Sequence, residues 1–362
     1  MKVVIAGGGT GGHFFPALAV GEELARRFAG TEVVYVGSTG GFEARWLAAS
    51  GHRYRLLGSR GVRGRGFASR LSALARFVAA LGGALCLVRS FRPDVVVSAG
   101  GYAAAPVAAA AVLCRRPLVL LEQNTRPGLV NRLLARFASA VCVGFEEAAG
   151  AFGRAQVVVT GNPVRFVPNG AWAQPAEERP LVLVLGGSSG AHRLNLGVIG
   201  ALKIIRERAI QWTFLHQAGE ADVAVVREAY ATLGCRAEVV AFIEEMAQAL
   251  SRASLVVARA GAMTVSEVAL AARPAVFIPY PFHSDRQQEW NARVLERQDA
   301  AVIVADDDAL ADNLARRPRE LLEDRARLAA MGARARLTAK PQARSAVARV
   351  CARAAGIESV AT

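Results

Sequence analysis

The sequence repeats one local plan, in which a short apolar segment is followed by a run of glycines and then by an amphipathic, helix-like segment. The first copy has residues 2–6 before glycine-rich residues 7–12, and the second has residues 181–185 before residues 186–190, 179 positions later. Short apolar runs alternate with helical stretches after each copy, which is typical of a parallel sheet covered on both faces. We therefore predict an α/β protein with two doubly wound, Rossmann-like domains facing a central cleft, and ligands beyond the carboxyl ends of the strands.

The length of 362 residues suits two domains. Residues 164–180 contain several prolines and show neither a strand nor a helix period, which predicts a linker. We expect the first domain at residues 1–163 and the second at residues 181–341. A helix at residues 342–357 is expected to rejoin the first domain.

The five cysteines are scattered and never form a Cys-x-x-Cys pair, which favours a reducing compartment and argues against a disulfide frame or a zinc site. Met1 and Lys2 lead directly into an apolar strand, so no signal peptide is expected. The longest uninterrupted apolar runs, residues 77–88 and 103–114, are about 12 residues long, short of the ~20 needed to span a bilayer. We expect a cytoplasmic protein that does not cross the membrane.

The formal net charge of +14 attracts polyanions, either nucleic acid or anionic lipid headgroups. Lysine occurs at only three positions, so a genome-wide arginine bias is an alternative explanation. Residues 60–81 place arginines among apolar side chains, which predicts a basic loop and an apolar-faced helix that anchor the protein to anionic lipid. The alternative is a core-facing helix with arginines on its wet side. The residues assigned to this anchor are Arg63, Arg65, Phe67, Arg70, Leu71 and Phe77.

The first glycine run, residues 7–13, contains the Gly-x-Gly-x-x-Gly pattern of dinucleotide sites. In such sites the second strand ends in an acidic residue that holds the ribose, but here the strand ends at residues 36–39 and nothing acidic follows until Glu43. NAD is therefore disfavoured, whereas phosphate binding by backbone N–H groups stays open. Further glycine turns, at residues 98–102 and 186–191, favour a cleft that grips phosphate from both sides.

Residues 259–267 follow an apolar strand and open a helix, whose first N–H groups can bind phosphate. Glu267 is placed to accept hydrogen bonds from a ribose diol. The alternative is a capping box from Thr264 to Glu267, which has the right spacing. A polar cluster at residues 279–291 offers amide side chains that suit sugar hydroxyls.

Six motifs occur in order: Gly-Gly-Thr-Gly-Gly-His at 8–13, Glu-Gln-Asn at 122–124, Gly-Asn-Pro-Val-Arg at 161–165, Gly-Gly-Ser at 186–188, residues 261–267, and Asp-Arg-Gln-Gln at 285–288. Together they resemble the MurG family of UDP-N-acetylglucosamine:undecaprenyl-diphospho-muramoylpentapeptide N-acetylglucosaminyltransferases, over nearly the whole chain. The resemblance implies the GT-B fold. It also implies an inverting transfer of N-acetylglucosamine from UDP to the muramoyl 4-hydroxyl of undecaprenyl-linked lipid I, giving lipid II for peptidoglycan at the cytoplasmic face of the inner membrane.

The resemblance also assigns residues. His13 matches the family's candidate base, and the turn at Gly100, Gly101 and Tyr102 is assigned to the acceptor. Leu121 stands where the family commonly has histidine, and Ser189 where it has glutamine; the first change removes any base at that position. The implied donor contacts are Thr10, Gly11, Gly12, Asn124, Arg165, Ser188, Ile243, Ala262, Met263, Thr264, Val265, Ser266, Glu267 and Gln288.

Helix N-termini, loop amides and Arg165 can stabilise a departing UDP, so we expect neither a cofactor nor a bound metal. Residues 306–308 have the Asp-x-Asp form of metal-dependent transferases, but they lie between a strand and a helix and are interpreted as a solvated cap. His13 is either the base or a hydrogen-bonding partner of phosphate or backbone.

Other functions remain open at this point: another GT-B glycosyltransferase, a UDP-sugar epimerase, an NAD oxidoreductase, or a non-catalytic UDP-sugar-binding subunit. No nucleic-acid partner is expected.

Overall fold

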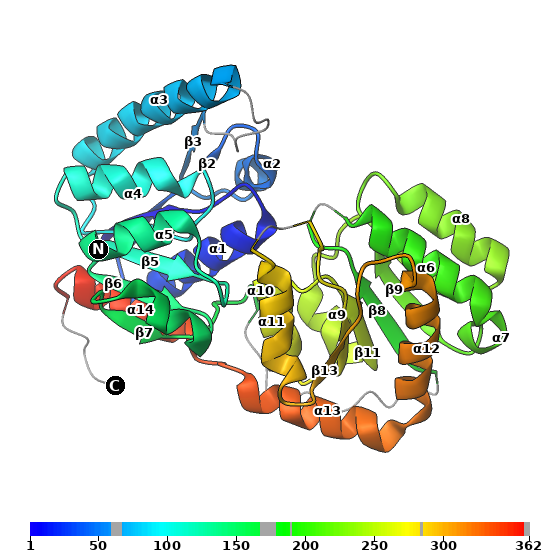
Figure 1. The fold of residues 1–362 in the computed structure, drawn as a ribbon. Coiled ribbons are helices and arrows are strands. Elements are labelled where there is room, and N and C mark those ends of the chain that lie inside the picture. The colour runs from blue at the N-terminus through cyan, green and yellow to red at the C-terminus, as the bar shows by residue number, and fades with distance from the viewer. Residues whose placement is uncertain (59–66, 167–178, 189, 283–284, 358–362) are drawn as a thin grey trace. The chain divides into compact units, whose positions relative to one another are not determined.

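The computed structural model describes residues 1–58, 67–166, 179–188, 190–282 and 285–357 (Figure 1). The chain divides into two units, one formed by Met1–Arg165 with Gln342–Thr362 and the other by Phe166–Pro341. Each described unit is built on one parallel sheet. The prediction of two doubly wound α/β domains is confirmed.

The first unit has a seven-stranded parallel sheet in the order β3-β2-β1-β4-β5-β6-β7. The central strand β1 pairs with β2 on one side and β4 on the other, so that Val3 lies opposite both Val33 and Val95. The strand bounds are β1 Lys2–Ala6, β2 Glu32–Ser38, β3 Tyr54–Leu57, β4 Val95–Ser98, β5 Leu118–Glu122, β6 Ala140–Val143 and β7 Val157–Val159.

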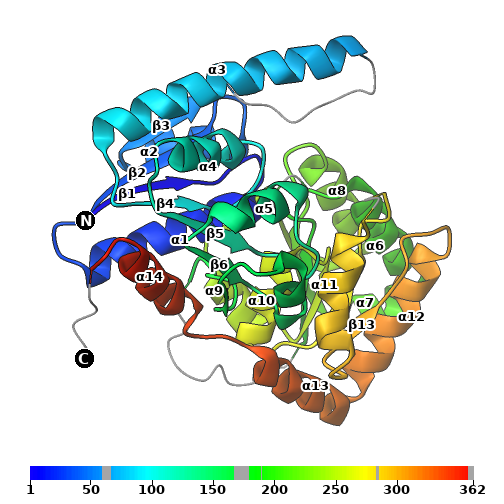
Figure 2. The same ribbon diagram turned by 60° about the vertical axis from the view of Figure 1, so that its left-hand side comes forward.

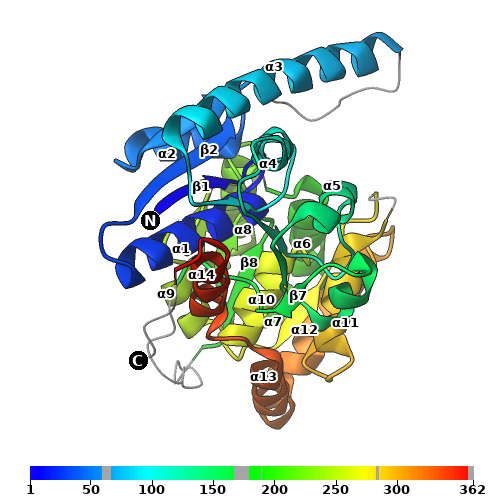
Figure 3. The ribbon, with the colours of Figure 1, turned by 90° about the vertical axis from the view of Figure 1, so that its left-hand side faces the viewer.

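Helices cover both faces of this sheet because successive side chains of each strand point to opposite sides. Val3 and Ile5 pack with α1, α2 and α14, whereas Val4 and Ala6 pack with α3 and α4. Figure 3 shows α1 beside α14 on one side and α3 beside α4 on the other. The bounds are α1 Gly11–Arg27, α2 Phe42–Ala49, α3 Phe67–Phe91, α4 Ala104–Leu113, α5 Leu129–Leu134, η1 Ala135–Phe137, η2 Glu146–Phe152 and α14 Ala343–Ala354.

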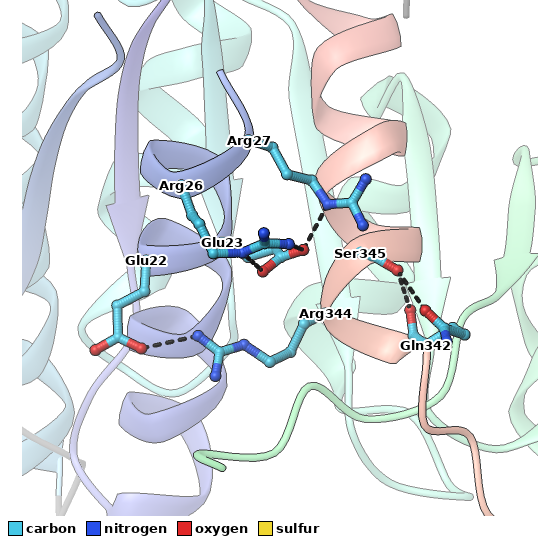
Figure 4. A network of polar contacts seen from close by, with 7 residues as sticks. All are labelled: Glu22, Glu23, Arg26, Arg27, Gln342, Arg344 and Ser345. Carbon is cyan, nitrogen blue, oxygen red and sulfur yellow. Dashed lines mark hydrogen bonds and ion pairs between the residues drawn. The ribbon is translucent and has the colours of Figure 1, made fainter. Parts of the chain in front are cut away.

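The carboxyl-terminal helix α14 completes the first unit. Val347, Ala348 and Cys351 are fully buried in the same core cluster as the β1 side chains. At the edge of this contact the Arg344 guanidinium donates to Glu22 on α1 at 2.8 Å (Figure 4). Burial of apolar side chains, rather than the exposed ion pair, therefore holds α14 in place.

The second unit has a six-stranded parallel sheet in the order β10-β9-β8-β11-β12-β13, the same winding as the first. Its strands are β8 Leu181–Leu185, β9 Thr213–Gln217, β10 Arg236–Val240, β11 Leu255–Ala258, β12 Ala275–Phe277 and β13 Ala301–Ile303. Its helices are α6 His192–Ile204, α7 Arg206–Ala209, α8 Val223–Leu233, α9 Met246–Arg252, α10 Ala262–Leu270, α11 Gln287–Glu296, α12 Leu310–Glu323 and α13 Arg325–Thr338.

Helices α6 and α12 lie side by side on one face of the second sheet (Figure 2). A Cβ added at Gly197 would come within 2.6 Å of the Leu310 side chain, so glycine permits this close packing. On the same face His216 is fully buried between Asn195 and Tyr230, and burial lowers its pKa to about 4. This histidine is therefore a neutral core residue at physiological pH.

Helix α3 is longer and more apolar than the uninterrupted apolar runs of the sequence suggested. Its stretch Leu71–Phe91 is long and apolar enough to cross a bilayer by length and composition, and 17% of its most apolar window is buried. Counting uninterrupted apolar runs missed it, because single polar residues such as Arg76 break the run but not the helix.

Candidate active site

The glycine turns predicted from the sequence follow the strands at which each sheet reverses its order. In the first sheet these are β1 and β4, and in the second they are β8 and β11. Ligands of doubly wound sheets bind beyond the carboxyl ends of such strands. Each unit therefore brings two separate weak motifs together at its expected ligand site.

His13 lies in the first turn of α1, half-buried, and is held by hydrogen bonds from its Nδ1. That nitrogen is 2.9 Å from the Ala99 carbonyl oxygen and 3.2 Å from Gln123 Oε1. Gln123 Nε2 donates to the same Ala99 oxygen at 2.9 Å. Because the carbonyl can only accept, we infer that His13 Nδ1 carries the hydrogen and that Nε2 is the basic nitrogen of the neutral ring.

The turn predicted to contact the acceptor packs directly against His13. Gly100 and Gly101 have φ values of +84° and +79°, and a Cβ at Gly100 would lie 3.1 Å from His13 Nδ1. A Cβ at Gly101 would lie 2.3 Å from the Gly8 carbonyl oxygen, and one at Gly9 would meet the Tyr102 ring at 2.6 Å. The structure thus brings Gly100, Gly101 and Tyr102 together with the first glycine loop and the candidate base.

Glu43 contacts the first glycine loop, and sequence reasoning missed this contact. Its buried carboxylate accepts hydrogen bonds from Gly9 N–H at 2.9 Å and from Ser38 N–H and Oγ–H at 2.8 and 2.9 Å. The Gly9 amide predicted for phosphate is therefore already engaged by the protein's own carboxylate. The available signal was an acidic residue shortly after β2, which the sequence analysis considered only for a ribose.

The other predicted residues of the first unit surround this loop region. Thr10 is the exposed N-cap of α1, followed by buried Gly11 and exposed Gly12. Asn124 donates from both its backbone and its side chain to Glu122 Oε1, at 3.0 and 3.3 Å. The Arg165 guanidinium lies 5.0 Å from the centroid of the Phe15 ring.

Position 121 holds leucine where the family commonly has histidine. Leu121 is buried in the core cluster that includes α1 and α14. An aliphatic side chain suits that position.

In the second unit, Gln217 connects two predicted donor segments and was also missed. Its Nε2 donates to the Gly187 carbonyl at 2.7 Å, and its Oε1 accepts from the Ile243 N–H at 3.0 Å. A uracil that pairs through the Ile243 N–H would therefore have to displace Gln217. Half-buried Ser188 adjoins Gly187, while Ser189 lies outside the described residues.

The capping-box interpretation of Thr264 and Glu267 is wrong. Helix α10 begins at Ala262 with Gly261 as its N-cap, so Thr264 is the third helical residue and caps nothing. The first intrahelical hydrogen bond of α10 runs from Val265 N–H to the Gly261 carbonyl at 3.0 Å. The N–H groups of residues 262–264 come before it and belong to the first turn, which can bind an anion. Ala262, Met263, Val265 and Glu267 are buried, and half-buried Thr264 and Ser266 complete the predicted segment.

The interpretation of residues 306–308 as a solvated cap is wrong for Asp306. Its fully buried carboxylate pairs with Arg193 at 2.8 Å and with Arg259 at 2.7 Å. Asp307 does behave as expected, because its exposed side chain accepts from Ala309 N–H at 3.0 Å just before α12. Gln288, the predicted sugar contact, accepts from Tyr280 N–H through Oε1 at 2.9 Å.

Among the described residues, no group of three or more histidine, cysteine, aspartate or glutamate side chains is arranged to hold a metal ion. That the reaction runs without a metal stays a prediction. Of the anchor residues, Arg63 and Arg65 lie outside the described residues, as do the side chains of Phe67 and Arg70 at the start of α3. Leu71 and Phe77 are exposed on α3.

Comparisons with known proteins define the class. Residues 3–143 match the glycosyltransferase family 28 N-terminal domain, and residues 181–350 match the glycosyltransferase family 28 C-terminal domain. The protein is a GT-B glycosyltransferase.

Curated relatives give the particular family. Proteins of Syntrophotalea carbinolica and Geobacter sulfurreducens, both named UDP-N-acetylglucosamine--N-acetylmuramyl-(pentapeptide) pyrophosphoryl-undecaprenol N-acetylglucosamine transferase, are 40% identical over 98% and 96% of this chain and 99% and 97% of theirs. The crystal structure of Acinetobacter baumannii MurG is 31% identical with a TM-score of 0.76, covering 97% of this chain and 99% of that one. The chain belongs to the MurG family.

A UDP-N-acetylglucosamine 2-epimerase structure from Listeria monocytogenes, described as putative in its own name, is 15% identical with a TM-score of 0.68, covering 96% of this chain and 94% of that one. At that identity the likeness concerns the fold alone. The epimerase alternative is not favoured.

Proposed function

We propose that this enzyme transfers N-acetylglucosamine from UDP-N-acetylglucosamine to the muramoyl 4-hydroxyl of undecaprenyl-linked lipid I, giving lipid II for peptidoglycan. The observation that carries this proposal is the 40% identity, over nearly the full length of both chains, to transferases named for that donor and acceptor. The local geometry of each unit supplies the chemical parts that the reaction needs.

The second unit holds the donor. The first-turn amides of α10, with the positive end of its dipole, and Ser188 stabilise the diphosphate as its charge develops. Glu267 accepts from the ribose hydroxyls and Gln288 contacts the sugar. The backbone of Ile243 pairs with uracil after Gln217 Oε1 has left the Ile243 N–H. Neutralisation by protein dipoles and arginine makes a bound metal unnecessary in this proposal.

The first unit supplies the base. The 4-hydroxyl oxygen attacks C1 of N-acetylglucosamine from the face opposite the diphosphate, the C1–O bond to phosphate breaks, and UDP leaves with the electron pair. The hydroxyl proton passes to His13 Nε2, while Nδ1 stays bonded to the Ala99 carbonyl. Single displacement of this kind inverts the anomeric centre.

The direct test is incubation of the protein with labelled UDP-N-acetylglucosamine and a lipid I analogue. Labelled disaccharide product, equal in amount to the UDP released, is the expected result. Epimerised UDP-sugar would instead favour the epimerase, and nucleotide that is bound but never turned over would favour a binding subunit. No affinity for UDP would refute the proposal.

We further propose that the enzyme is peripheral at the cytoplasmic face of the inner membrane and that α3 lies on anionic lipid rather than crossing it. Ala84 and Val88, inside the apolar stretch, are fully buried in the sheet core, which holds that half of the helix on the protein. The other half exposes Leu71, Leu74 and Val78, spaced to share one face, with Arg76 nearby. In this proposal the positively charged protein binds anionic lipid rather than nucleic acid.

The double variant Leu71→Gln/Leu74→Gln should bind vesicles containing phosphatidylglycerol at least about tenfold more weakly, because each leucine buried contributes about 1.5–3 kcal/mol. Vesicle co-sedimentation measures this, and UDP binding should be unchanged. Leu337→Gln removes an exposed leucine from α13 of the second unit and serves as the matched control. Equal vesicle binding by all three proteins would contradict the proposal, and loss of folding would instead favour a core-facing helix.

A further inference from the structure

Asp306 is a buried carboxylate held between two arginines. Oδ1 accepts from Arg193 Nε at 2.8 Å and Oδ2 accepts from Arg259 Nη2 at 2.7 Å. A carboxylate removed from water is costly unless charged donors satisfy both oxygens, and here both are satisfied. The neighbouring carboxylates of Asp307 and Asp308 are exposed, so burial is specific to one member of the triplet.

The two arginines come from the segments that form the donor half of the site. Arg193 is the second residue of α6, which follows the glycine turn after β8. Arg259 directly follows β11 and precedes Gly261, the N-cap of α10. Asp306, which follows β13, therefore connects the segment after β8 with the segment after β11. These are the two strands at which the second sheet reverses its order.

Arg259 extends this connection to Gln288. Its Nη1 donates to the carbonyl oxygens of Ile278 and Pro279, at 3.0 and 3.5 Å, and its guanidinium lies 5.8 Å from the centroid of the Tyr280 ring. The next polar group along the backbone, the Tyr280 N–H, donates to Gln288 Oε1 at 2.9 Å. The Gln288 amide is thereby oriented with its oxygen accepting from Tyr280, which leaves its NH₂ group as the donor for a ligand.

We propose that Asp306 is a positioning residue for recognition of the donor sugar, acting through Arg259 and the backbone of residues 278–280 on the Gln288 amide. This inference rests on the proposed function, in which Gln288 contacts the sugar of UDP-N-acetylglucosamine. Asp306 itself touches neither substrate. We expect a larger effect on the sugar portion of the donor than on UDP, which separates Asp306 from a carboxylate that merely stabilises the fold.

The test compares Asp306→Asn with Asp308→Asn, which removes the same charge from an exposed site two residues away. Isothermal titration calorimetry of each protein with UDP and with UDP-N-acetylglucosamine gives the ratio of the two affinities. Asp306→Asn should weaken UDP-N-acetylglucosamine about tenfold, the worth of one hydrogen bond, and UDP less than about twofold. Asp308→Asn should leave both affinities at the wild-type values.

Two outcomes overturn the proposal: an unchanged ratio of the two affinities, or equal weakening of UDP and UDP-N-acetylglucosamine. The double variant Asp306→Asn/Gln288→Ala adds a second criterion, because a residue that acts through Gln288 has no further effect once that amide is absent. Additive losses in the double variant would also overturn it.

Should Asp306→Asn fail to fold, Arg193→Gln carries the test. The Arg193 side chain is 48% exposed, so its loss is less costly to the fold. It should shift the affinity ratio in the same direction by about two- to fourfold, and no shift overturns the proposal. If wild-type protein fails to bind UDP, the proposed function fails. If wild-type protein binds both ligands but the variants leave the ratio of the two affinities unchanged, this inference alone fails.

Discussion

His13→Gln should lower kcat for N-acetylglucosamine transfer by about 10²–10⁴-fold, the usual contribution of a general base, while the affinity for UDP stays at the wild-type value. Glutamine keeps a donor that can reach the Ala99 carbonyl but lacks a basic nitrogen. The loss should therefore appear in kcat and not in donor binding. Single-turnover rates with saturating lipid I analogue, together with calorimetric UDP titration, measure the two quantities.

His52→Gln is the matched control. His52 precedes β3, so it lies towards the amino ends of the first sheet's strands, whereas the predicted site lies at their carboxyl ends. It packs with the Tyr35 and Trp46 rings at centroid distances of 5.1 and 6.1 Å. Its variant should turn over normally. A His13→Gln enzyme that retains more than about a third of wild-type kcat would exclude His13 as the base and leave it a structural partner of the backbone.

Glu267→Ala should raise the Kd for UDP by about 10–100-fold. Hydrogen bonds to a charged group contribute about 1.5–3 kcal/mol each, and this carboxylate is buried on the second turn of α10. If it binds the ribose diol, the wild-type protein should prefer UDP over 2′-deoxy-UDP and the variant should lose that preference.

Competition binding with the two nucleotides measures the preference, and circular dichroism reports whether α10 and its sheet remain folded. Glu296→Ala removes an exposed carboxylate from α11 in the same unit and should change neither nucleotide affinity. Weakened binding of UDP with its preference over 2′-deoxy-UDP intact would refute a ribose contact and indicate that Glu267 only supports the helix.

The fold could be predicted from the sequence because buried parallel strands leave a strong local signal. Residues such as Val3–Ala6 and Leu255–Ala258 are apolar throughout, and glycine turns end the strands that matter most. Strand β3 leaves a weaker signal because Tyr54–Leu57 lies at the edge of the sheet, where Tyr54 and Arg55 are exposed and the apolar run is short. Its pattern does not differ from that of a loop.

The site could be predicted only in part. Motifs with a local signature, such as residues 7–13 and 259–267, lie at the switch points as expected. Glu43, Gln123 and Gln217 were missed because their roles depend on which strands adjoin, and the strand order is a property of the whole sheet. Asp306 was misinterpreted for the same reason. Three consecutive aspartates suggest a solvated turn, and only the folded structure shows that Arg193 and Arg259 pair with the first of them.

The position of α14 has a consequence for how the protein is made. The helix packs Val347, Ala348 and Cys351 against one face of the first sheet, over β4, β5 and β6, yet it is encoded after the entire second unit. During translation the amino-terminal half therefore emerges before the helix that covers part of its apolar core, whereas the strands of the second unit are contiguous in the sequence. Nearly the whole chain must be synthesised before the first unit can complete its core. Until then its incompletely packed apolar surface makes the nascent chain prone to aggregate.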